Sequence, residues 1–157
     1  MTVTADRLRE LLDYDPLTGR FTWRVRKSQR CKAGSMAGSI GGRGYRYIEI
    51  DGRSYRAARL AVLHKTGQWP AGVVDHRNNA HDDDSWENLR DVTQAINCQN
   101  RGRGRVVSST GLLGVQEDHG RFRAVIDKVH IGSFGAPEEA SAAYLAAKRQ
   151  QHPGCTI

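Results

Sequence analysis

The stretch that decides the fold is VVDHRNNAHDDDSWENLRDVTQAINCQN, residues 73–100. It begins with a short apolar run, typical of a buried strand, that ends in Asp75 and His76. A loop rich in Asn and Asp follows, and Thr93 can then cap a short helix that carries Asn97. The stretch therefore predicts a strand, a long loop and a helix, with polar side chains at both ends of the loop.

The sequence on either side predicts further small elements. Upstream, we expect a helix capped by Thr4 and carrying Leu8, Leu11 and Leu12, a strand at 21–25, a glycine-rich loop at 27–44, a hairpin from residue 45 with its turn at 51–52 and a return strand beginning at Tyr55, and a helix at about 57–66. Downstream, we expect three short strands, near Val115, at 121–126 and at 130–134, and then a helix that Pro137 starts.

The size and composition favour two small domains over one large core. The chain has 157 residues, of which 38% are hydrophobic and 26% are charged. Small domains bury a smaller share of their surface, so a polar composition suits them. We expect an α+β protein with one domain at 1–105 and a second at 106–157, joined near the basic, glycine-rich run that ends at Arg105.

Positive charge is concentrated in the first part of the chain. Residues 1–105 hold 19 Lys and Arg against 12 Asp and Glu, whereas residues 106–157 hold 5 of each. Within 20–65 the count is 12 basic against 2 acidic residues. Such clustering favours a polyanionic partner, most simply nucleic acid. A basic surface that serves only solubility is the alternative.

The cysteines and the first residues indicate a reducing compartment. Cys31, Cys98 and Cys155 have no metal-ligand spacing, and their odd number argues against a disulfide framework. Residues 1–20 contain acidic side chains and no apolar core of a signal peptide, and no apolar run has membrane-spanning length. We expect a cytoplasmic protein that does not interact with a membrane.

Three side chains at the ends of the loop have the chemistry of a phosphodiester-cutting site. Asp75 and the side-chain oxygen of Asn97 suit a hard cation such as Mg²⁺, and His76 suits a base that titrates near neutral pH. Neighbours in a strand point to opposite faces, so Asp75 and His76 share one site only if the strand ends or twists there. The alternative is an Asp-His pair present by chance, with Asn88 and Asn97 as turn and cap residues.

Two resemblances sharpen this hypothesis. Val74-Asp75-His76, Asp83, Glu87-Asn88-Leu89-Arg90, Thr93 and Asn97, preceded by Tyr55-Arg56-Ala57 and Trp69-Pro70, resemble the HNH motif of phage and intron-encoded homing endonucleases, which have a ββα-metal (His-Me finger) fold. Gly114-Val115, Arg121-Phe122-Arg123-Ala124, Ile131-Gly132-Ser133-Phe134 and Pro137-Glu138-Glu139-Ala140 resemble an AP2 DNA-binding domain, a small three-stranded sheet plus one helix.

The HNH resemblance implies a role for each site residue. His76 is expected to be the general base, and Asp75 and Asn97 to hold one divalent ion, Mg²⁺ or else Mn²⁺. Asn88 is expected to hold the loop and orient His76. The Cys-x-x-Cys pairs that hold a structural zinc in some HNH proteins do not occur in this sequence. A phage-encoded enzyme of this kind would act in the host cytosol.

The expected DNA contacts are arginines in three places. They are Arg43, Arg46, Arg53 and Arg56 of the hairpin region, Arg101 and Arg103 of the basic joint, and Arg121 and Arg123 of the AP2-like module. The basic joint suits either an arm in a minor groove or a plain flexible linker.

Other titratable residues are expected to lie outside the chemistry. Five further histidines show no ligand spacing and are interpreted as non-catalytic: His64, His81, His119, His130 and His152. The acidic run Asp82-Asp83-Asp84 is interpreted as a solvated loop rather than a cation site, because like charges repel unless a metal lies among them.

The sequence thus predicts an endonuclease that hydrolyses double-stranded DNA. One site per chain favours nicking by a monomer, whereas a homodimer would cut both strands. A DNA-binding regulator that keeps the HNH frame without cutting is the main alternative, and an RNA-binding module with the same charge is the third.

Overall fold

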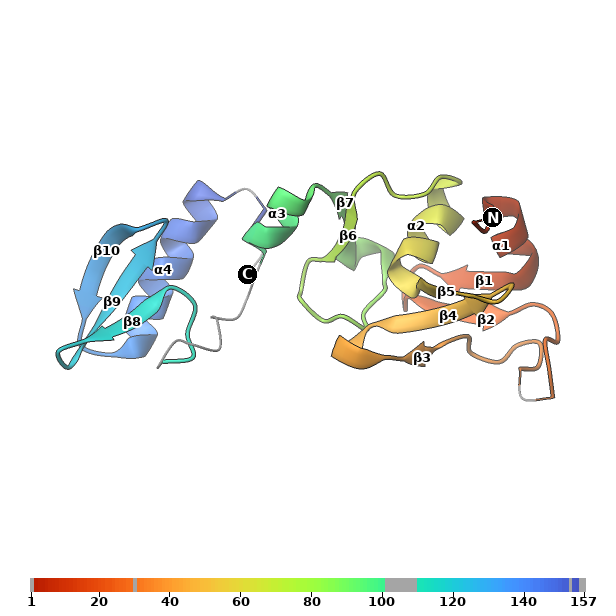
Figure 1. Ribbon diagram of the computed structural model, residues 1–157, viewed down its shortest axis with the longest axis horizontal. Helices are drawn as coiled ribbons and strands as arrows, with labels where there is room; N and C mark the ends of the chain where they lie inside the picture. Colours follow the sequence, from red (N-terminus) through yellow and green to blue (C-terminus); the bar gives the residue numbers. More distant parts are fainter. Residues whose placement is uncertain (1, 30, 101–109, 153, 156–157) are drawn as a thin grey trace. The chain divides into compact units, whose positions relative to one another are not determined.

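The computed structural model describes residues 2–29, 31–100, 110–152 and 154–155, which form two compact units, Met1–Thr93 and Gln94–Ile157. Both units combine helices with strands (Figure 1), in agreement with the predicted α+β class. The predicted domain boundary between residues 105 and 106 lies outside the described residues.

The described residues of the first unit form two α-helices and three small antiparallel sheets. Its elements are α1 (Ala5–Leu11), β1 (Leu12–Asp15), β2 (Arg20–Trp23), β3 (Ser39–Ile40), β4 (Arg46–Ile50), β5 (Arg53–Arg56), α2 (Ala57–Thr66), β6 (Val73–His76) and β7 (Leu89–Val92), with single 3-10 turns at Gly42–Gly44 and Trp86–Asn88. The sheets are β1–β2, β3–β4–β5 and β6–β7. The strand at 73–76 and the helix at 57–66 lie where the sequence predicts them.

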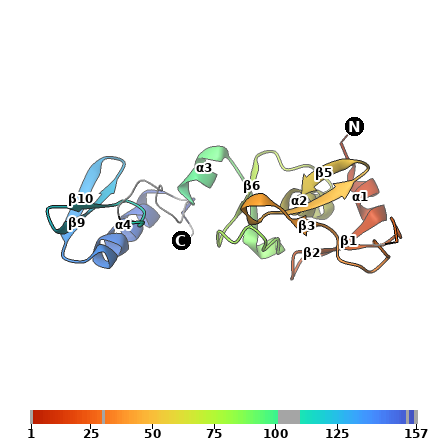
Figure 2. The ribbon, with the colours of Figure 1, turned by 60° about the horizontal axis from the view of Figure 1, so that its bottom comes forward.

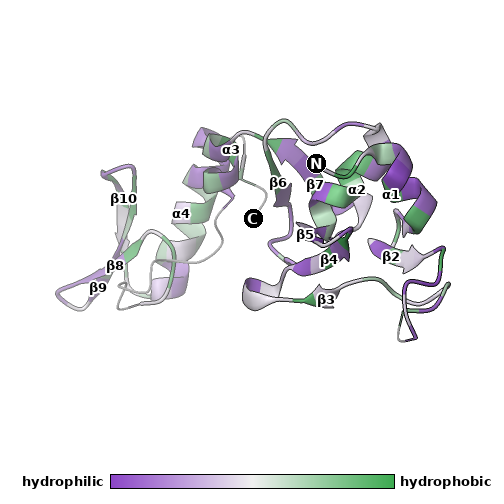
Figure 3. Ribbon diagram, turned by 45° about the vertical axis from the view of Figure 1, so that its right-hand side comes forward, coloured by the Kyte–Doolittle hydropathy of each residue, from purple (hydrophilic) through white to green (hydrophobic). Residues whose placement is uncertain are grey.

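Helix α2 is the centre of the first core. It packs on β4, β5 and α1 (Figures 1 and 2), and Figure 3 shows that its residues are largely hydrophobic. Leu60 of α2, Phe21 of β2 and Ile48 of β4 are each inaccessible to solvent. The helix ends at Gly67, whose φ of 78° is the left-handed conformation that glycine adopts without strain. This core fixes the sheet on which the hairpin arginines lie.

Two short strands differ from the sequence-based expectation. Leu12, predicted on the first helix, instead starts β1 and pairs with Trp23 of β2. Leu12 and Tyr14 are buried while Asp13 and Asp15 are exposed, so pairing with β2 favours a period of two over the helix. Strand β3 lies inside the region predicted to be a loop, where Ser39 and Ile40 pair with β4.

The decisive stretch forms an antiparallel pair, β6–β7, followed by a helix. Val74 lies opposite Asp91, Asp75 opposite Arg90, and the last pair joins His76 to Leu89. A loop of residues 77–88 connects the two strands. Helix α3 (Gln94–Gln99) follows, as the sequence predicts, and belongs to the second unit.

The second unit continues with one antiparallel sheet and a long helix. The elements are β8 (Val115–Asp118), β9 (Arg121–Ile126), β10 (Val129–Phe134) and α4 (Pro137–Gln151), with β9 in the middle of the sheet (Figure 1). The turns between these strands lie at residues 119–120 and 127–128, where all four residues have positive φ, as tight type I′ hairpin turns require.

An apolar core joins this sheet to α4. Val115, Ala124 and Ile126 of the sheet are buried against Ala140 and Tyr144 of the helix. Glu138 and Glu139 lie in the first turn of α4, and basic residues lie in its last turn, which complements the helix dipole. No helix in the described ranges has the length and apolar character needed to cross a membrane.

Candidate functional site

His76 is the last residue of β6 and its ring is buried. The imidazole Nε2 lies 3.0 Å from Oδ1 of Asp84, a residue of the connecting loop. The two side chains are only 3% and 2% exposed. The expectation that the acidic run is a solvated loop is therefore wrong for Asp84, which faces the interior and pairs with the histidine.

The β1–β2 hairpin holds the backbone of Asp84. The hydroxyl of Tyr14 donates a hydrogen bond of 2.7 Å to the carbonyl of Asp84, and burial raises the pKa of that tyrosine. Gly19 packs so closely that a β-carbon there would overlap the backbone of Asp84 and Ser85. The amide of Trp86 donates to the carbonyl of Pro16 at 2.9 Å. The N-terminal hairpin thereby fixes the place of Asp84.

Asp75 has a different partner from its neighbour His76. Arg90 lies directly opposite on β7, and its Nε and Nη2 atoms lie 2.8 and 2.7 Å from Oδ2 of Asp75. Both side chains are largely buried, at 8% exposure for Asp75 and 14% for Arg90. The alternation of a strand thus gives two adjacent residues two different pairings, one with the opposite strand and one with the loop.

Asn88 ties the two ends of the loop together. Its side-chain oxygen accepts a hydrogen bond of 3.0 Å from the amide of Asn78, and its Nδ2 donates one of 2.7 Å to the carbonyl of Asp83. The amide of Arg77 also donates to the backbone carbonyl of Asn88 at 2.9 Å. These bonds close the loop immediately after His76.

Asp83, next to Asp84, is bound within the loop. Its carboxylate accepts hydrogen bonds from the hydroxyl of Ser85 at 2.6 Å and from Nδ2 of Asn78 at 2.7 Å. The Ser85 hydroxyl is the main reason that the pKa of Asp83 lies below its ordinary value. The loop therefore keeps one carboxylate for its own architecture and another for His76.

An aromatic and cationic cluster connects the β4–β5 sheet to the histidine. The ring of Tyr45 stacks on that of His81 at 4.2 Å, and the ring of His76 lies 5.9 Å from Tyr45 and 6.1 Å from His81. The guanidinium of Arg56 lies over Tyr45 at 4.2 Å. Nδ1 of His81 lies 2.8 Å from the carbonyl of Arg43. His81, interpreted from sequence as non-catalytic, is thus a close neighbour of His76.

The predicted arginines of the hairpin do not share one face. The strand register places Arg53 opposite Ile50 and Arg56 opposite Tyr47, on opposite sides of the sheet. Arg46 lies on the side of the buried Ile50, and Arg43 lies in the turn before β4. Arg53 and Arg56 are exposed.

The predicted contacts of the second unit have partners within their own sheet. Nη2 of Arg121 donates to the carbonyl of Ser133 at 3.1 Å, and Nη1 of Arg123 lies 3.3 Å from a carboxylate oxygen of Asp118. Arg121 is exposed and Arg123 is half-buried. Arg101 and Arg103 lie outside the described residues.

The predicted ligands of a divalent ion lie in different units. Asp75 lies on β6 of the first unit, and the half-buried Asn97 lies on α3 of the second, so their convergence stays a prediction. The described residues contain no group of three or more His, Cys, Asp or Glu side chains placed to hold a metal. The predicted pair, one carboxylate and one amide, is smaller than such a group, and its oxygen donors suit a hard cation.

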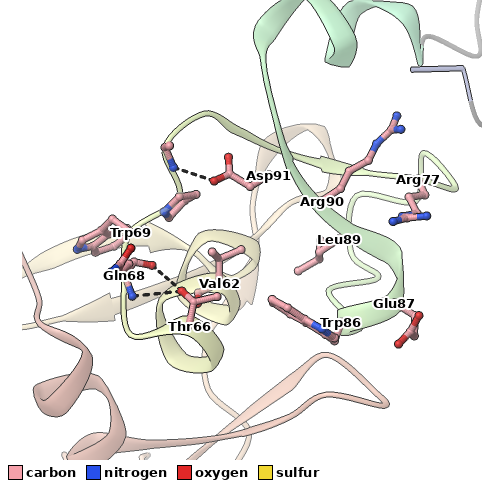
Figure 4. Close-up of a pocket in the computed structure, with 12 residues that line it drawn as sticks. Val62, Thr66, Gln68, Trp69, Arg77, Trp86, Glu87, Leu89, Arg90 and Asp91 are labelled. Carbon is pink, nitrogen blue, oxygen red and sulfur yellow. Dashed lines mark hydrogen bonds between the residues drawn. The ribbon is translucent and has the colours of Figure 1, made fainter. Parts of the chain in front are cut away.

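A cavity of about 530 Å³ lies beside this segment (Figure 4). Its apolar lining includes Trp86, Val62 and Leu89, and its charged lining includes Arg77 and Arg90. Asp75, His76 and Asn88 do not line it. The cavity therefore meets the candidate site at Arg90, the partner of Asp75, and at Arg77, whose amide donates to Asn88.

Comparison with known proteins gives two matches. Residues 55–99, less than half of the chain, match the family model of HNH endonucleases. A solved structure titled as DNA binding and cleavage by the HNH homing endonuclease I-HmuI is similar with 27% identity and a TM-score of 0.44. That similarity covers 57% of this chain and 51% of the other, so the matched part spans about half of that protein. No curated protein matches the chain.

Sequence reasoning missed three residues that surround His76: Asp84, Tyr45 and His81. Tyr45 is distant from His76 in the sequence, and its ring comes near that of His76 only in the folded chain. The signal for Asp84 was present in the sequence, since a carboxylate eight residues after a histidine in a short loop can fold back onto it. The three consecutive carboxylates of Asp82-Asp83-Asp84 instead favoured the interpretation of a solvated loop.

Proposed function

We propose that this chain is a metal-dependent HNH endonuclease that hydrolyses phosphodiester bonds of double-stranded DNA. The observation that carries the proposal is the buried histidine at the end of β6, held by Asp84 and followed by a loop that Asn88 closes. The match of residues 55–99 to the HNH endonuclease family supports it. The concentration of basic residues in 20–65 supports a nucleic-acid substrate.

In this proposal His76 takes the proton from the attacking water. Its position at the end of a strand, with a ring fixed on one side by a carboxylate, suits a base that must meet the scissile phosphate in one orientation. Asn88 has a structural role, because its two side-chain hydrogen bonds fix the course of the chain after His76. A positioned base contributes about 10²–10⁴-fold to a rate.

Asp75 and Asn97 are proposed to hold the divalent ion, Mg²⁺ or Mn²⁺. Both contacts of Arg90 reach Oδ2 of Asp75, and they hold the carboxylate in one rotamer. A fixed rotamer suits a metal ligand, because partners of this kind orient the group that binds the ion. When bound, the ion would stabilise charge on the scissile phosphate and on the leaving 3′ oxygen.

Phosphate neutralisation by the basic residues is proposed to supply sequence-independent affinity. Arg53 and Arg56 are exposed on the hairpin, and Arg43 precedes it. The second unit is proposed to be an AP2-like DNA-binding module. Arg121 and Arg123 would exchange their partners within the protein for contacts in a groove of the DNA. Binding should weaken with salt through counterion release, and a salt slope near zero would contradict this part.

The second candidate is a DNA-binding regulator that does not cut. The internal partner of Asp75 favours it, because a carboxylate paired with arginine is engaged before any metal arrives. An RNA-binding protein is the third candidate, and competition between double-stranded DNA and RNA separates it from both.

Relaxation of supercoiled plasmid tests the proposal. The native chain should nick plasmid with Mg²⁺ or Mn²⁺ and stop in EDTA, and His76→Ala should lose the activity. One site per chain predicts nicked circles from a monomer, while linear product would indicate a dimer. Tight DNA binding without cutting, across several metals and with DNA of the protein's own source, would favour the regulator.

A further inference from the structure

We infer that Asp84 is a positioning residue that fixes the tautomer of His76. Its carboxylate accepts a hydrogen bond from Nε2–H, so that Nδ1 is the unprotonated nitrogen and the one that takes the proton of water. The inference rests on the proposed function in assigning this proton transfer to His76, but the tautomer itself is a property of the protein without DNA or metal.

The argument starts from the geometry of the pair. A neutral imidazole carries one N–H, and an ionised carboxylate can only accept a hydrogen bond. With Nε2 of His76 3.0 Å from Oδ1 of Asp84, the proton must therefore lie on Nε2. The two side chains are 3% and 2% exposed, so water does not compete for this bond. The same pairing logic orients the histidine in acid–base triads.

The burial of Asp84 is costly for the fold. Oδ2 of its carboxylate accepts no hydrogen bond in the described part of the chain, although it is inaccessible to solvent. A buried polar atom without a partner costs about 1–3 kcal/mol, and more when it belongs to a charged group. A neutral or apolar side chain would avoid this cost. Its other oxygen, Oδ1, lies 3.0 Å from Nε2 of the candidate base.

The surroundings of Asp84 hold it rigidly. Tyr14 donates to its carbonyl, and Gly19 leaves no room for its backbone to move toward the β1–β2 hairpin. Asp83, one residue earlier, has its own partners in Ser85 and Asn78 and does not substitute for it. A hairpin far away in sequence thus supports the carboxylate, as a positioning residue requires.

The tautomer can be read directly by NMR. In a long-range ¹H–¹⁵N correlation spectrum of the full-length ¹⁵N-labelled protein at alkaline pH, the His76 ring should give a protonated Nε2 and an unprotonated Nδ1. The spectrum of His76→Gln assigns the signals by their absence. An Nδ1–H tautomer in the native protein would overturn the inference, whether or not the protein cuts DNA.

Kinetics test the consequence for nicking. Asp84→Ala and Asp84→Asn should each lower kcat at least about 10-fold with little change in KM, because the ring loses its fixed tautomer while the DNA contacts remain. The exposed neighbour gives a matched control, Asp82→Asn, which should keep the native kcat. Thermal unfolding followed by tryptophan fluorescence checks that each variant is folded.

Asp84→Asn guards against a simple folding defect, since it keeps the volume of the side chain. Its His76 signals should move toward the Nδ1–H pattern, because a buried amide can donate to Nε2. Native kcat in a folded Asp84→Asn protein with an altered tautomer would overturn the positioning role. If the native chain cuts no DNA, the proposed function fails, and the NMR result still decides the tautomer.

Discussion

The strand–loop–strand segment of residues 73–92 and the sheet of the second unit bury different kinds of side chain. The first buries a carboxylate, a histidine, a second carboxylate and an amide: Asp75, His76, Asp84 and Asn88. The buried residues of the described sheet β8–β10 are Val115, Ala124 and Ile126, all apolar. One region is held by specific polar pairings, and the other by hydrocarbon packed on a helix.

The difference teaches where each region should be sensitive. Buried polar groups destabilise a fold unless each has its partner, so removing one partner damages the other. An apolar sheet–helix core depends on shape, and it should respond to lost or added volume. All three tryptophans of the chain, at positions 23, 69 and 86, lie in the first unit, so their fluorescence reports on that unit alone.

The largest effect should come from the buried ion pair. Arg90→Ala removes the arginine that pairs with the buried carboxylate of Asp75 and should lower the free energy of unfolding of the first unit by about 3–5 kcal/mol. Urea denaturation followed by tryptophan fluorescence measures this. The control is Arg24→Ala, whose partner Asp13 is exposed, and it should cost about 1 kcal/mol or less. Equal losses in the two variants would contradict the contrast.

The second unit should be destabilised most by a side chain that does not fit its core. A β-carbon at Gly114 would overlap the ring of Tyr144, and its φ of 71° is unfavourable for alanine. Gly114→Ala should destabilise this unit by about 2–4 kcal/mol, as circular dichroism of the helix would measure, with the tryptophan transition unchanged. Gly120→Ala is the control, because its φ is also positive but its β-carbon meets open space. A helix transition in Gly114→Ala no lower than that of Gly120→Ala would contradict the role of shape in this core.

A smaller effect is expected at the loop closure. Asn88→Ala removes the partner of the Asn78 amide and of the Asp83 carbonyl and should destabilise the first unit by about 2 kcal/mol. The nicking rate should fall even under conditions in which the variant is fully folded, because the chain after His76 loses its fixed path. The control is Gln68→Ala, which removes an amide side chain from the exposed α2–β6 connection and should change neither quantity. Full nicking by a folded Asn88→Ala protein would contradict the role given to this residue.

The smallest effect should be a pH dependence of the first unit. Burial, followed by the charge of Arg9, lowers the pKa of His64 below its ordinary value. The unfolded chain then binds the proton more readily than the fold, so the stability contribution is present above the ordinary value of 6.5 and is lost as pH falls through the lower folded pKa. His64→Gln should flatten this decline in urea denaturation, whereas His119→Gln, in an exposed turn, should not. An unchanged slope in His64→Gln would contradict the account.

Local sequence patterns predicted most of the fold. The apolar run into Asp75, the two-residue turns and the helix at 57–66 are encoded by neighbouring residues, and each lies where expected. The strand that starts at Leu12 could not be predicted in the same way, because its pairing with Trp23 outweighs the helical spacing of the leucines before it.

The candidate site was predictable as a set of residue types but not as a set of contacts. The sequence identifies Asp75, His76 and Asn88, whereas it does not say that Arg90 binds one of them and Asp84 another. Those pairings depend on the register of β6 with β7 and on a hairpin whose Tyr14 lies 70 residues before Asp84. Side-chain partners across such separations arise only in the folded chain.

Plasmid nicking by matched histidine variants tests the central claim most directly. Native protein, His76→Ala and His119→Ala would be compared in Mg²⁺, since His119 is 98% exposed and lies in the second unit. The account predicts that His76→Ala loses at least about 10²-fold of the nicking rate while His119→Ala keeps the native rate. Nicking by His76→Ala at the native rate would contradict it.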